Sequence, residues 1–212
     1  HKPLNLSILL THFHLDHIGD LGDLMISAWH AGREQPLRIF GPPGLTTIIR
    51  ALVEQVYQYD THFFHVFDTY LGHSRGDIRA ILDIHEITPG VVTECAQWNV
   101  VTDYVEHGAQ LGLSRHEWPC VGYRVEHHGN IVTISGDTIV CDALYRLADG
   151  ADVLVQGCYL ADAELTNPEF KVLSDTVIAS STQVGMFSAR AGVATVVLTH
   201  IRKKSRQLMQ AL

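Results

Sequence analysis

The chain has 212 residues, of which 46% are hydrophobic and 18% are charged, and its formal net charge is −8 at pH 7. This composition is ordinary for a globular α/β protein with a sizeable core and excludes a disordered chain. The negative charge argues against a general nucleic-acid-binding surface. The sequence shows neither an apolar run of membrane-spanning length nor a signal-peptide pattern at its start. We therefore predict a single cytoplasmic domain over residues 1–212.

The first part of the chain alternates strand and helix patterns. Residues 6–10 are apolar and predict a buried strand, and apolar positions spaced three and four apart predict a helix from Asp20 to about His30. A strand over 37–40 ends at a turn with two prolines between two glycines, and a helix follows over 46–57. This alternation indicates an α/β fold.

Residues 57–78 are rich in aromatic residues and histidines but show no clean period. We predict an irregular connection here. Its rings would form either a substrate-facing wall over a nearby site or a cap on the core.

The second part of the chain is richer in strands. Alternating and β-branched patterns predict strands over 78–84 and 98–105, and residues 121–135 predict a hairpin. His127 and His128 belong to the exposed turn of that hairpin. Further elements are predicted as a helix over 142–148, a strand over 152–156, a helix from the capping box of Ser180 and Gln183 to about Gly192, and a strand over 195–198.

The four cysteines are widely spaced and form no Cys-x-x-Cys pair. This spacing supports neither a zinc knuckle nor a redox motif. We expect reduced, partly buried thiols at Cys95, Cys120, Cys141 and Cys158.

The stretch Thr11-His12-Phe13-His14-Leu15-Asp16-His17 follows the first predicted strand. Imidazole and carboxylate donors in this density suit Zn²⁺, Fe²⁺ or Mn²⁺. His12 and His14 are two apart, so on an extended backbone they point the same way and can hold one ion. Asp16 and His17 come after the chain begins to turn and can face a second ion. The stretch is therefore predicted to be a metal site.

The order His12-x-His14-x-Asp16-His17 resembles the signature of the metallo-β-lactamase superfamily. Val105-Glu106-His107, Ile134-Ser135-Gly136-Asp137-Thr138 and Val197-Leu198-Thr199-His200 resemble later motifs of that family in the same order. Further stretches, such as residues 40–44, are most similar to the ribonuclease Z and arylsulfatase-like hydrolases. The resemblance implies an αββα sandwich and, in the family pattern, several strands before the first motif, which this sequence does not show.

The resemblance also implies a site and a chemistry. Two divalent ions, most simply Zn²⁺ with Mn²⁺ or Fe²⁺ as alternatives, would support a bridging hydroxide that cleaves an ester-type bond. Asp16 would also orient that hydroxide or take its proton, and a homodimer is expected from the family. The implied ligands are His12, His14 and His107 for the first ion, Asp16, His17 and His200 for the second, and Asp137 as the bridge.

The substrate follows less directly from the resemblance. Ribonuclease Z enzymes have a histidine at the start of the helix before the fifth motif, but residues 177–180 of this chain contain no histidine. They also often have a His-Glu pair after the preceding strand, where this chain has Gln156-Gly157. The short interval between His107 and Asp137 leaves no room for a tRNA-gripping arm. We therefore favour a small-molecule phosphoester, sulfoester or lactone, with a ribonuclease Z-like endoribonuclease or a non-catalytic metal-binding module as alternatives.

A basic run follows His200. Arg202, Lys203, Lys204 and Arg206 would either bind phosphate or sulfate, or form a solvated helix face.

Overall fold

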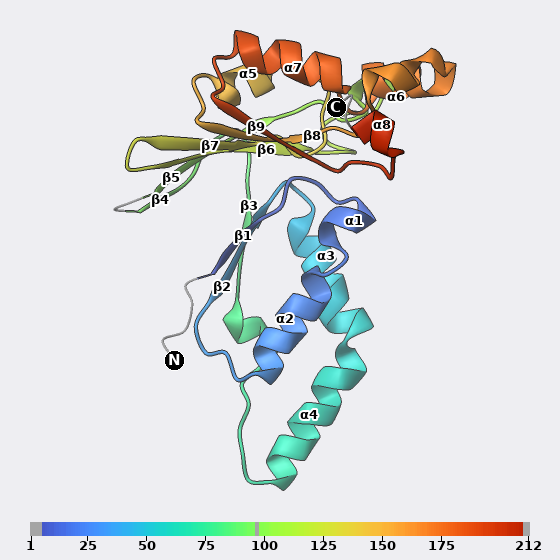
Figure 1. Cartoon of the computed structure of the whole chain (residues 1–212). Helices are drawn as coiled ribbons and strands as arrows, with labels where there is room; N and C mark the ends of the chain where they lie inside the picture. The colour runs from blue at the N-terminus through green and yellow to red at the C-terminus, as the bar shows by residue number, and fades with distance from the viewer. Residues whose placement is uncertain (1–5, 96–97, 210–212) are drawn as a thin grey trace. The chain divides into compact units, whose positions relative to one another are not determined.

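The computed structural model of the chain describes residues 6–95 and 98–209 and divides into two compact units, His1–Ile87 and Thr88–Leu212 (Figure 1). Each unit combines a sheet with helices, so the predicted mixed α/β class is confirmed. One domain over residues 1–212 stays a prediction. Among the described residues, no helix has both the length and the apolar character needed to cross a membrane.

The first unit is built on a parallel sheet in the order β1-β2-β3. Its strands pair in register, with Ile8 opposite Ile39 and Ile39 opposite Ile84. The elements in chain order are β1 (Ser7–Leu9), α1 (Leu15–Ile18), α2 (Leu21–His30), β2 (Leu37–Gly41), α3 (Leu45–Ala51), the π-helical turn η1 (Leu52–Val56), α4 (Gln58–Tyr70), the 3₁₀ turn η2 (Ile78–Ile81) and β3 (Leu82–Glu86).

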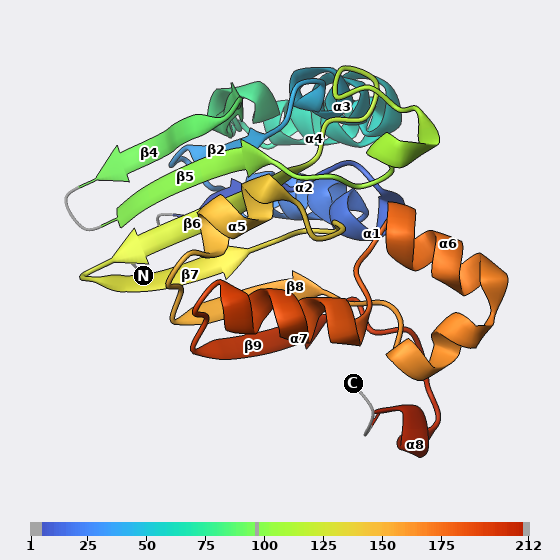
Figure 2. The same ribbon diagram turned by 90° about the horizontal axis from the view of Figure 1, so that it is seen from above.

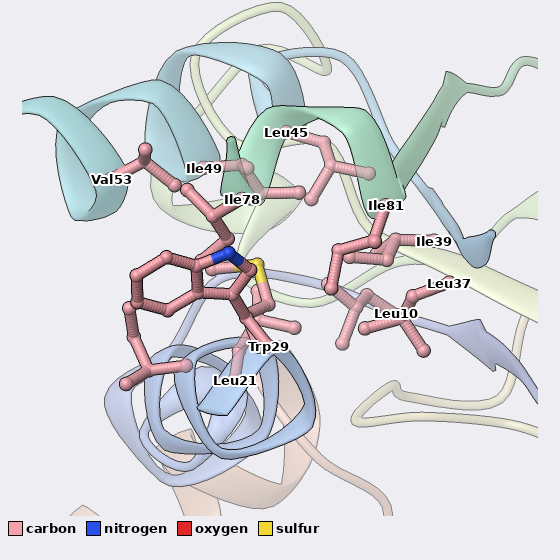
Figure 3. Packing of buried hydrophobic residues seen from close by; sticks show 12 residues of the cluster. Leu10, Leu21, Trp29, Leu37, Ile39, Leu45, Ile49, Val53, Ile78 and Ile81 are labelled. Atoms are coloured by element: carbon pink, nitrogen blue, oxygen red, sulfur yellow. The ribbon is translucent and has the colours of Figure 1, made fainter. Parts of the chain in front are cut away.

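The core of the first unit joins the sheet to α2 and α3. Leu21, Met25 and Trp29 recur at intervals of four on α2 and are buried, as the predicted periodicity requires. They pack in one cluster with residues of the sheet, including Ile39 of β2 (Figure 3). This core fixes the end of β1, from which the first predicted ligands follow.

The prediction of an irregular connection over 57–78 is wrong, because most of it is the 13-residue helix α4. Its period is concealed because large aromatic side chains lie on the solvent side. Phe64 packs against the core, but Tyr59 and Tyr70 are 80% and 85% exposed. The core-cap interpretation therefore holds for Phe64 and not for the two exposed tyrosines.

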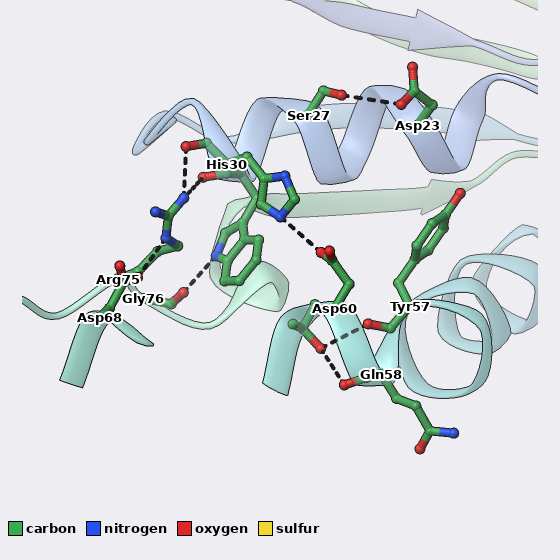
Figure 4. Close-up of polar contacts among 11 residues, drawn as sticks. Asp23, Ser27, His30, Tyr57, Gln58, Asp60, Asp68, Arg75 and Gly76 are labelled. Carbon is green, nitrogen blue, oxygen red and sulfur yellow. Dashed lines mark hydrogen bonds and ion pairs between the residues drawn. The ribbon is translucent and has the colours of Figure 1, made fainter. Parts of the chain in front are cut away.

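Polar contacts fasten α4 to the rest of the first unit (Figure 4). His30 at the end of α2 lies 2.8 Å from Oδ2 of Asp60. Arg75 donates to Oδ2 of Asp68 at 2.7 Å and to the carbonyl oxygen of His30 at 2.7 Å. The hydrogen bonds from Arg75 hold the pKa of the buried Asp68 carboxyl below its usual value, although burial opposes this.

The second unit is built on a sheet in the order β4-β5-β6-β7-β8-β9, with the strands side by side in Figure 2. Pairing is antiparallel from β4 to β7 and parallel from β7 to β9. The elements are β4 (Gly90–Cys95), β5 (Trp98–Tyr104), η3 (Ala109–Leu111), β6 (Val121–His127), β7 (Asn130–Ile134), α5 (Asp142–Ala148), β8 (Val153–Gly157), η4 (Asp162–Thr166), α6 (Pro168–Thr176), α7 (Ser181–Arg190), β9 (Thr195–Thr199) and α8 (Arg206–Met209).

Helices α5 and α7 cover one face of this sheet (Figure 1). Leu144 of α5, Leu154 of β8 and Phe187 of α7 meet in one buried cluster. The capping pattern predicted at the start of α7 is present, since the N–H of Ser180 donates to Oε1 of Gln183 at 2.8 Å.

The predicted hairpin is confirmed as β6 and β7. His128 and Gly129 form its turn with φ of 50° and 81°. The strand predicted over 78–84 begins later than expected, because residues 78–81 form the 3₁₀ turn η2.

Candidate metal centre

The first two histidines of the motif follow β1, and their side chains lie on the same side of the chain with one ring nitrogen of each close together. His12 is buried, and its Nε2 atom lies 3.1 Å from Nδ1 of His14. The hydroxyl of Thr11 lies 3.1 Å from Nδ1 of His12, so a hydrogen bond on one side of the ring orients the opposite nitrogen toward His14. The prediction that His12 and His14 point the same way is confirmed.

A single helical turn places the other two residues of the motif. The carbonyl oxygen of His14 accepts hydrogen bonds from the N–H groups of His17 and Ile18, at 3.0 and 3.2 Å, and so begins α1. The turn leaves Oδ2 of Asp16 3.6 Å from Nε2 of His17. It also places the ring centroid of His17 4.1 Å from that of His12, with the two ring planes tilted by 47°. The first unit thus gathers all four of its predicted ligands.

His107 follows β5 in the second unit and is held by one main-chain contact. Its side chain is buried, and Nδ1 lies 2.7 Å from the carbonyl oxygen of Val177. Because a carbonyl oxygen only accepts, Nδ1 carries the hydrogen and Nε2 presents a lone pair. This is the arrangement by which a metal-ligating histidine is usually oriented.

Asp137 lies close to both predicted histidine ligands of the second unit. Its Oδ2 is 3.3 Å from Nε2 of His200, and a carboxylate oxygen lies within 4.8 Å of a ring nitrogen of His107. Thr138 joins the two segments, because the N–H of Glu106 donates to its hydroxyl at 3.0 Å. The second unit therefore gathers its three predicted ligands.

Gly157 at the end of β8 makes room for the Asp137 carboxylate. A Cβ atom at residue 157 would lie 2.9 Å from the carbonyl oxygen of Gly136 and 3.0 Å from Oδ1 of Asp137. Real Cβ atoms are essentially never found at the shorter distance, so the glycine is required by this close approach. Gly157, the second residue of the pair that departs from the ribonuclease Z pattern, thus packs against a predicted ligand.

The backbone is strained at His200, and the residues that follow are held in place by Glu164 and Tyr159. His200 has φ 59°, in the left-handed region that residues with a Cβ atom rarely adopt. Arg202 and Lys204 both donate to the carboxylate of Glu164, at 2.5 Å each, and Lys204 also donates to the carbonyl oxygen of Tyr159 at 2.8 Å. The solvated-face interpretation is therefore wrong for Lys204, whose side chain is fully buried.

Burial is the main cause of the raised pKa values of two cysteines near these segments. Cys120, Cys141 and Cys158 are free thiols, as predicted. The structure describes the backbone of Cys95 but not its side chain. Burial raises the pKa of Cys120 to about 12, and the negative charge of Asp137 adds to the effect. Burial also raises the pKa of Cys158 to about 11. Neither thiol is prepared to act as a nucleophile.

Three supporting residues escaped the sequence patterns. Val177 contributes only a carbonyl oxygen, and Glu164 is one acidic residue among many until the fold brings Arg202 and Lys204 to it. Gly157 carried a signal, because a glycine that ends a buried strand often marks a close approach of other atoms. His128 lies in the exposed turn of the hairpin, as predicted. The prediction is wrong for His127, which is the half-buried last residue of β6 and stacks its ring on that of Trp98.

Comparison with known proteins identifies the family. Residues 5–201 match the family model described as the beta-lactamase superfamily domain. The chain belongs to the metallo-β-lactamase superfamily. The predicted family is thus confirmed, and with it the metallo-β-lactamase fold class.

Several similar proteins carry the name ribonuclease Z or tRNase Z. A putative ribonuclease Z of Mycobacterium tuberculosis is 33% identical over 199 residues, which are 91% of this chain and 82% of that protein. The ribonuclease Z of Mycobacterium bovis is 32% identical over 200 residues, and this chain spans 66% of its length. The crystal structure of human tRNase Z, short form, has a TM-score of 0.64 at 19% identity, over 93% of this chain and 72% of that one.

Proposed function

We propose that the protein is a metal-dependent hydrolase of RNA phosphodiesters, similar to ribonuclease Z. The observation that carries this proposal is the 33% identity to a putative ribonuclease Z over 91% of the chain. It favours the endoribonuclease alternative over the small-molecule ester that the sequence patterns favoured. A metallo-β-lactamase-fold hydrolase is common to both.

The donor atoms within each unit fit a divalent metal. In a tetrahedral site with ligands at about 2.0–2.1 Å, two ligand atoms lie about 3.3 Å apart. The separations of 3.1 Å between His12 and His14, and 3.3 Å between Asp137 and His200, agree with this spacing. Imidazole and carboxylate donors favour Zn²⁺, with Mn²⁺ or Fe²⁺ as alternatives.

We assign the ligands as the family resemblance implies. The position of Asp137 near both His107 and His200 supports its role as the bridge between two ions. Bound ions would supply Lewis acidity, which makes water a nucleophile near neutral pH and offsets charge on a phosphate. The first ion would be held by His12, His14 and His107 and the second by Asp16, His17 and His200.

Asp16 is the residue of the motif best suited to proton transfer. Its carboxylate is 61% exposed and lies 3.6 Å from Nε2 of His17. A hollow of about 550 Å³ on the first unit is lined by Asp16, His17 and Asp20, among other residues. Asp16 would therefore orient the attacking water or take its proton at the mouth of this hollow.

A second candidate is a hydrolase of small phosphate, sulfate or lactone esters. Gly157 favours this second candidate. It stands where ribonuclease Z enzymes often have a charged side chain, and its close packing against Asp137 leaves no space for such a side chain. Lys204 adds to this, since it is engaged with Glu164 and so is not offered to RNA phosphates.

The test compares substrates on chelated and metal-reloaded protein. A tRNA-containing transcript, an aryl phosphodiester, an aryl sulfate and a lactone are assayed beside elemental analysis of the metal. We expect about two ions per chain and cleavage of the transcript with a steep salt dependence, because phosphate contacts release counterions. His107→Ala is expected to abolish turnover and lower the metal content.

His116→Ala is the matched control, because His116 is exposed and belongs to neither predicted ligand group. It is expected to keep both metal and activity. Turnover of a small ester without RNA cleavage would select the second candidate. Full metal content without turnover of any substrate would contradict the enzyme proposal.

A further inference from the structure

A polar pocket of about 380 Å³ lies in the second unit, beside the two segments that carry His107 and Asp137. It is lined by Glu106, which directly precedes His107, and by Ile139, two positions after Asp137. The N–H of Ile139 donates to the carbonyl oxygen of Glu106 at 2.9 Å, so the pocket wall is continuous with the backbone of both segments. We call it the β5–α5 pocket, and its hydroxyl, amide and charged side chains are Tyr104, Glu106, Gln110, Arg115, Asp142 and Arg146.

Two sides of the β5–α5 pocket are held in place by hydrogen bonds. Arg146 donates to Oδ2 of Asp103 through Nε and a terminal nitrogen, at 2.9 and 2.7 Å. The turn that carries Arg115 is closed by Glu117, whose Oε2 accepts hydrogen bonds from the N–H and the hydroxyl of Ser114 at 3.0 and 2.6 Å. A wall fixed in this way loses little freedom when a ligand binds.

Three side chains of the pocket are open to a ligand. Glu106 is half-buried, and Gln110 and Arg115 are exposed. Over residues 6–95 and 98–209, none of these three side chains makes a hydrogen bond or an ion pair with the protein. Together they offer guanidinium and amide donors and carboxylate and amide acceptors. Converging polar groups of this kind, in a pocket of about 300–1,000 Å³, are typical of a ligand site.

The charges of the lining favour a ligand that is polar but uncharged. The two positive charges of Arg115 and Arg146 are balanced by the two negative charges of Glu106 and Asp142. Both carboxylates would repel a phosphate group, because like charges brought together in an interface oppose binding. The pocket therefore suits the base of a nucleotide better than its phosphate.

Tyr104 and Arg115 indicate that the ligand is flat. The guanidinium carbon of Arg115 lies 5.4 Å from the centroid of the Tyr104 ring. Aromatic rings and guanidinium planes are the surfaces on which unpaired RNA bases stack. Guanine fits the remaining groups, because arginine recognises its ring and carbonyl acceptors and a carboxylate such as Glu106 accepts from the N–H groups of its Watson–Crick edge.

We propose that the β5–α5 pocket binds one unpaired guanine base of the RNA substrate. The base would stack on Tyr104 or on the guanidinium of Arg115 and donate hydrogen bonds to Glu106. This inference rests on the proposed function, because it takes RNA as the substrate. It adds a preference for RNA that carries an unpaired guanine beside the bond to be cleaved.

The test measures binding of the four ribonucleosides to the metal-loaded whole chain by saturation-transfer NMR, each at about 1 mM. Nucleosides carry no phosphate, so a contact between phosphate and metal does not contribute to the signal. Guanosine is expected to give the strongest signal. Arg115→Ala is expected to weaken guanosine binding and to raise the KM for the tRNA-containing transcript, each about 10-fold, because it removes a stacking surface.

Arg190→Ala is the matched control, since the guanidinium carbon of Arg190 lies 5.6 Å from the ring of Tyr145 but outside the β5–α5 pocket. It is expected to bind guanosine as the wild type does. Arg115 is exposed, so its replacement is expected to leave the fold intact, and circular dichroism checks this. The proposal is overturned by the lack of a guanosine signal, by equal signals from all four nucleosides, or by guanosine binding that Arg115→Ala leaves unchanged.

The transcript assay separates this inference from the proposed function. Guanosine binding that depends on Arg115, without cleavage of the transcript, would support the base site and contradict RNA hydrolysis. Cleavage of the transcript with the same KM in the wild type and Arg115→Ala would contradict the base site alone.

Discussion

Glu164 stabilises the chain that follows His200, and its removal is expected to be costly. Burial alone would raise the pKa of its carboxyl, but hydrogen bonds from Lys204, the N–H of Ala161 and Arg202 outweigh this and lower the pKa from 4.5 to about 2. At about 1.4 kcal/mol per pKa unit, the shift corresponds to about 3 kcal/mol of stability.

The change to test is Glu164→Gln, which keeps the shape of the side chain and removes its charge. The variant leaves the buried Lys204 without a counter-ion, so we expect the free energy of unfolding at pH 7 to fall by about 3 kcal/mol. Because the pKa is lowered by folding, the stabilisation is present above about pH 4.5 and is lost as the pH falls toward 2.

Urea unfolding of both proteins at pH 7, 4 and 2.5 measures this difference. The gap between wild type and Glu164→Gln should narrow as the pH falls. Glu169→Gln is the control, because Glu169 is an exposed acidic residue in the first turn of α6 and should change stability by less than about 0.5 kcal/mol. A gap below about 1 kcal/mol at pH 7, or a gap that stays constant with pH, would refute the reasoning.

Two further predictions concern packing and burial. Gly157→Ala puts a Cβ atom 3.0 Å from a predicted ligand oxygen and should lower metal affinity by about 10- to 100-fold in calorimetric titration. Gly185→Ala is the control, because Gly185 has open space around it, and it should leave the affinity unchanged. If Gly157→Ala binds metal as tightly as the wild type, the prediction is wrong and the atoms around residue 157 move to make room for the Cβ atom. The raised pKa values of Cys120 and Cys158 predict that iodoacetamide at pH 8 leaves both thiols unmodified until urea unfolds the chain. Mass spectrometry measures the modification, and rapid labelling of the folded protein would contradict the prediction.

Elements with a strong local signal could be predicted from the sequence. The helix over 142–148 is found at those residues, and the hairpin of β6 and β7 was indicated by its glycine and asparagine. Helix α4 was missed because the period of a helix is recognised by apolar residues that face the core. On α4, large residues such as Tyr59 and Phe63 face solvent, so the pattern is inverted.

The candidate site likewise has features that the local sequence predicts and features that it does not. Ligand types and the shared direction of His12 and His14 follow from residues close in sequence. The contacts that orient other ligands do not, because His107 and the carbonyl oxygen of Val177 are separated by 70 positions. Such contacts depend on tertiary structure, which no local pattern records. That all seven residues act together on metal stays a prediction.

The order of strands in the second sheet has a consequence for how the protein folds. Strands β4 to β7 are neighbours in both sequence and sheet and pair antiparallel, so each pair can form without a helical crossover. Strands β8 and β9 join in parallel, and each must wait for a helical crossover. Pulse-labelled amide hydrogen exchange should therefore show protection in β4–β7 first. The segment that presents His200 would be completed last, so the final ligand is delivered only to a unit that has already folded.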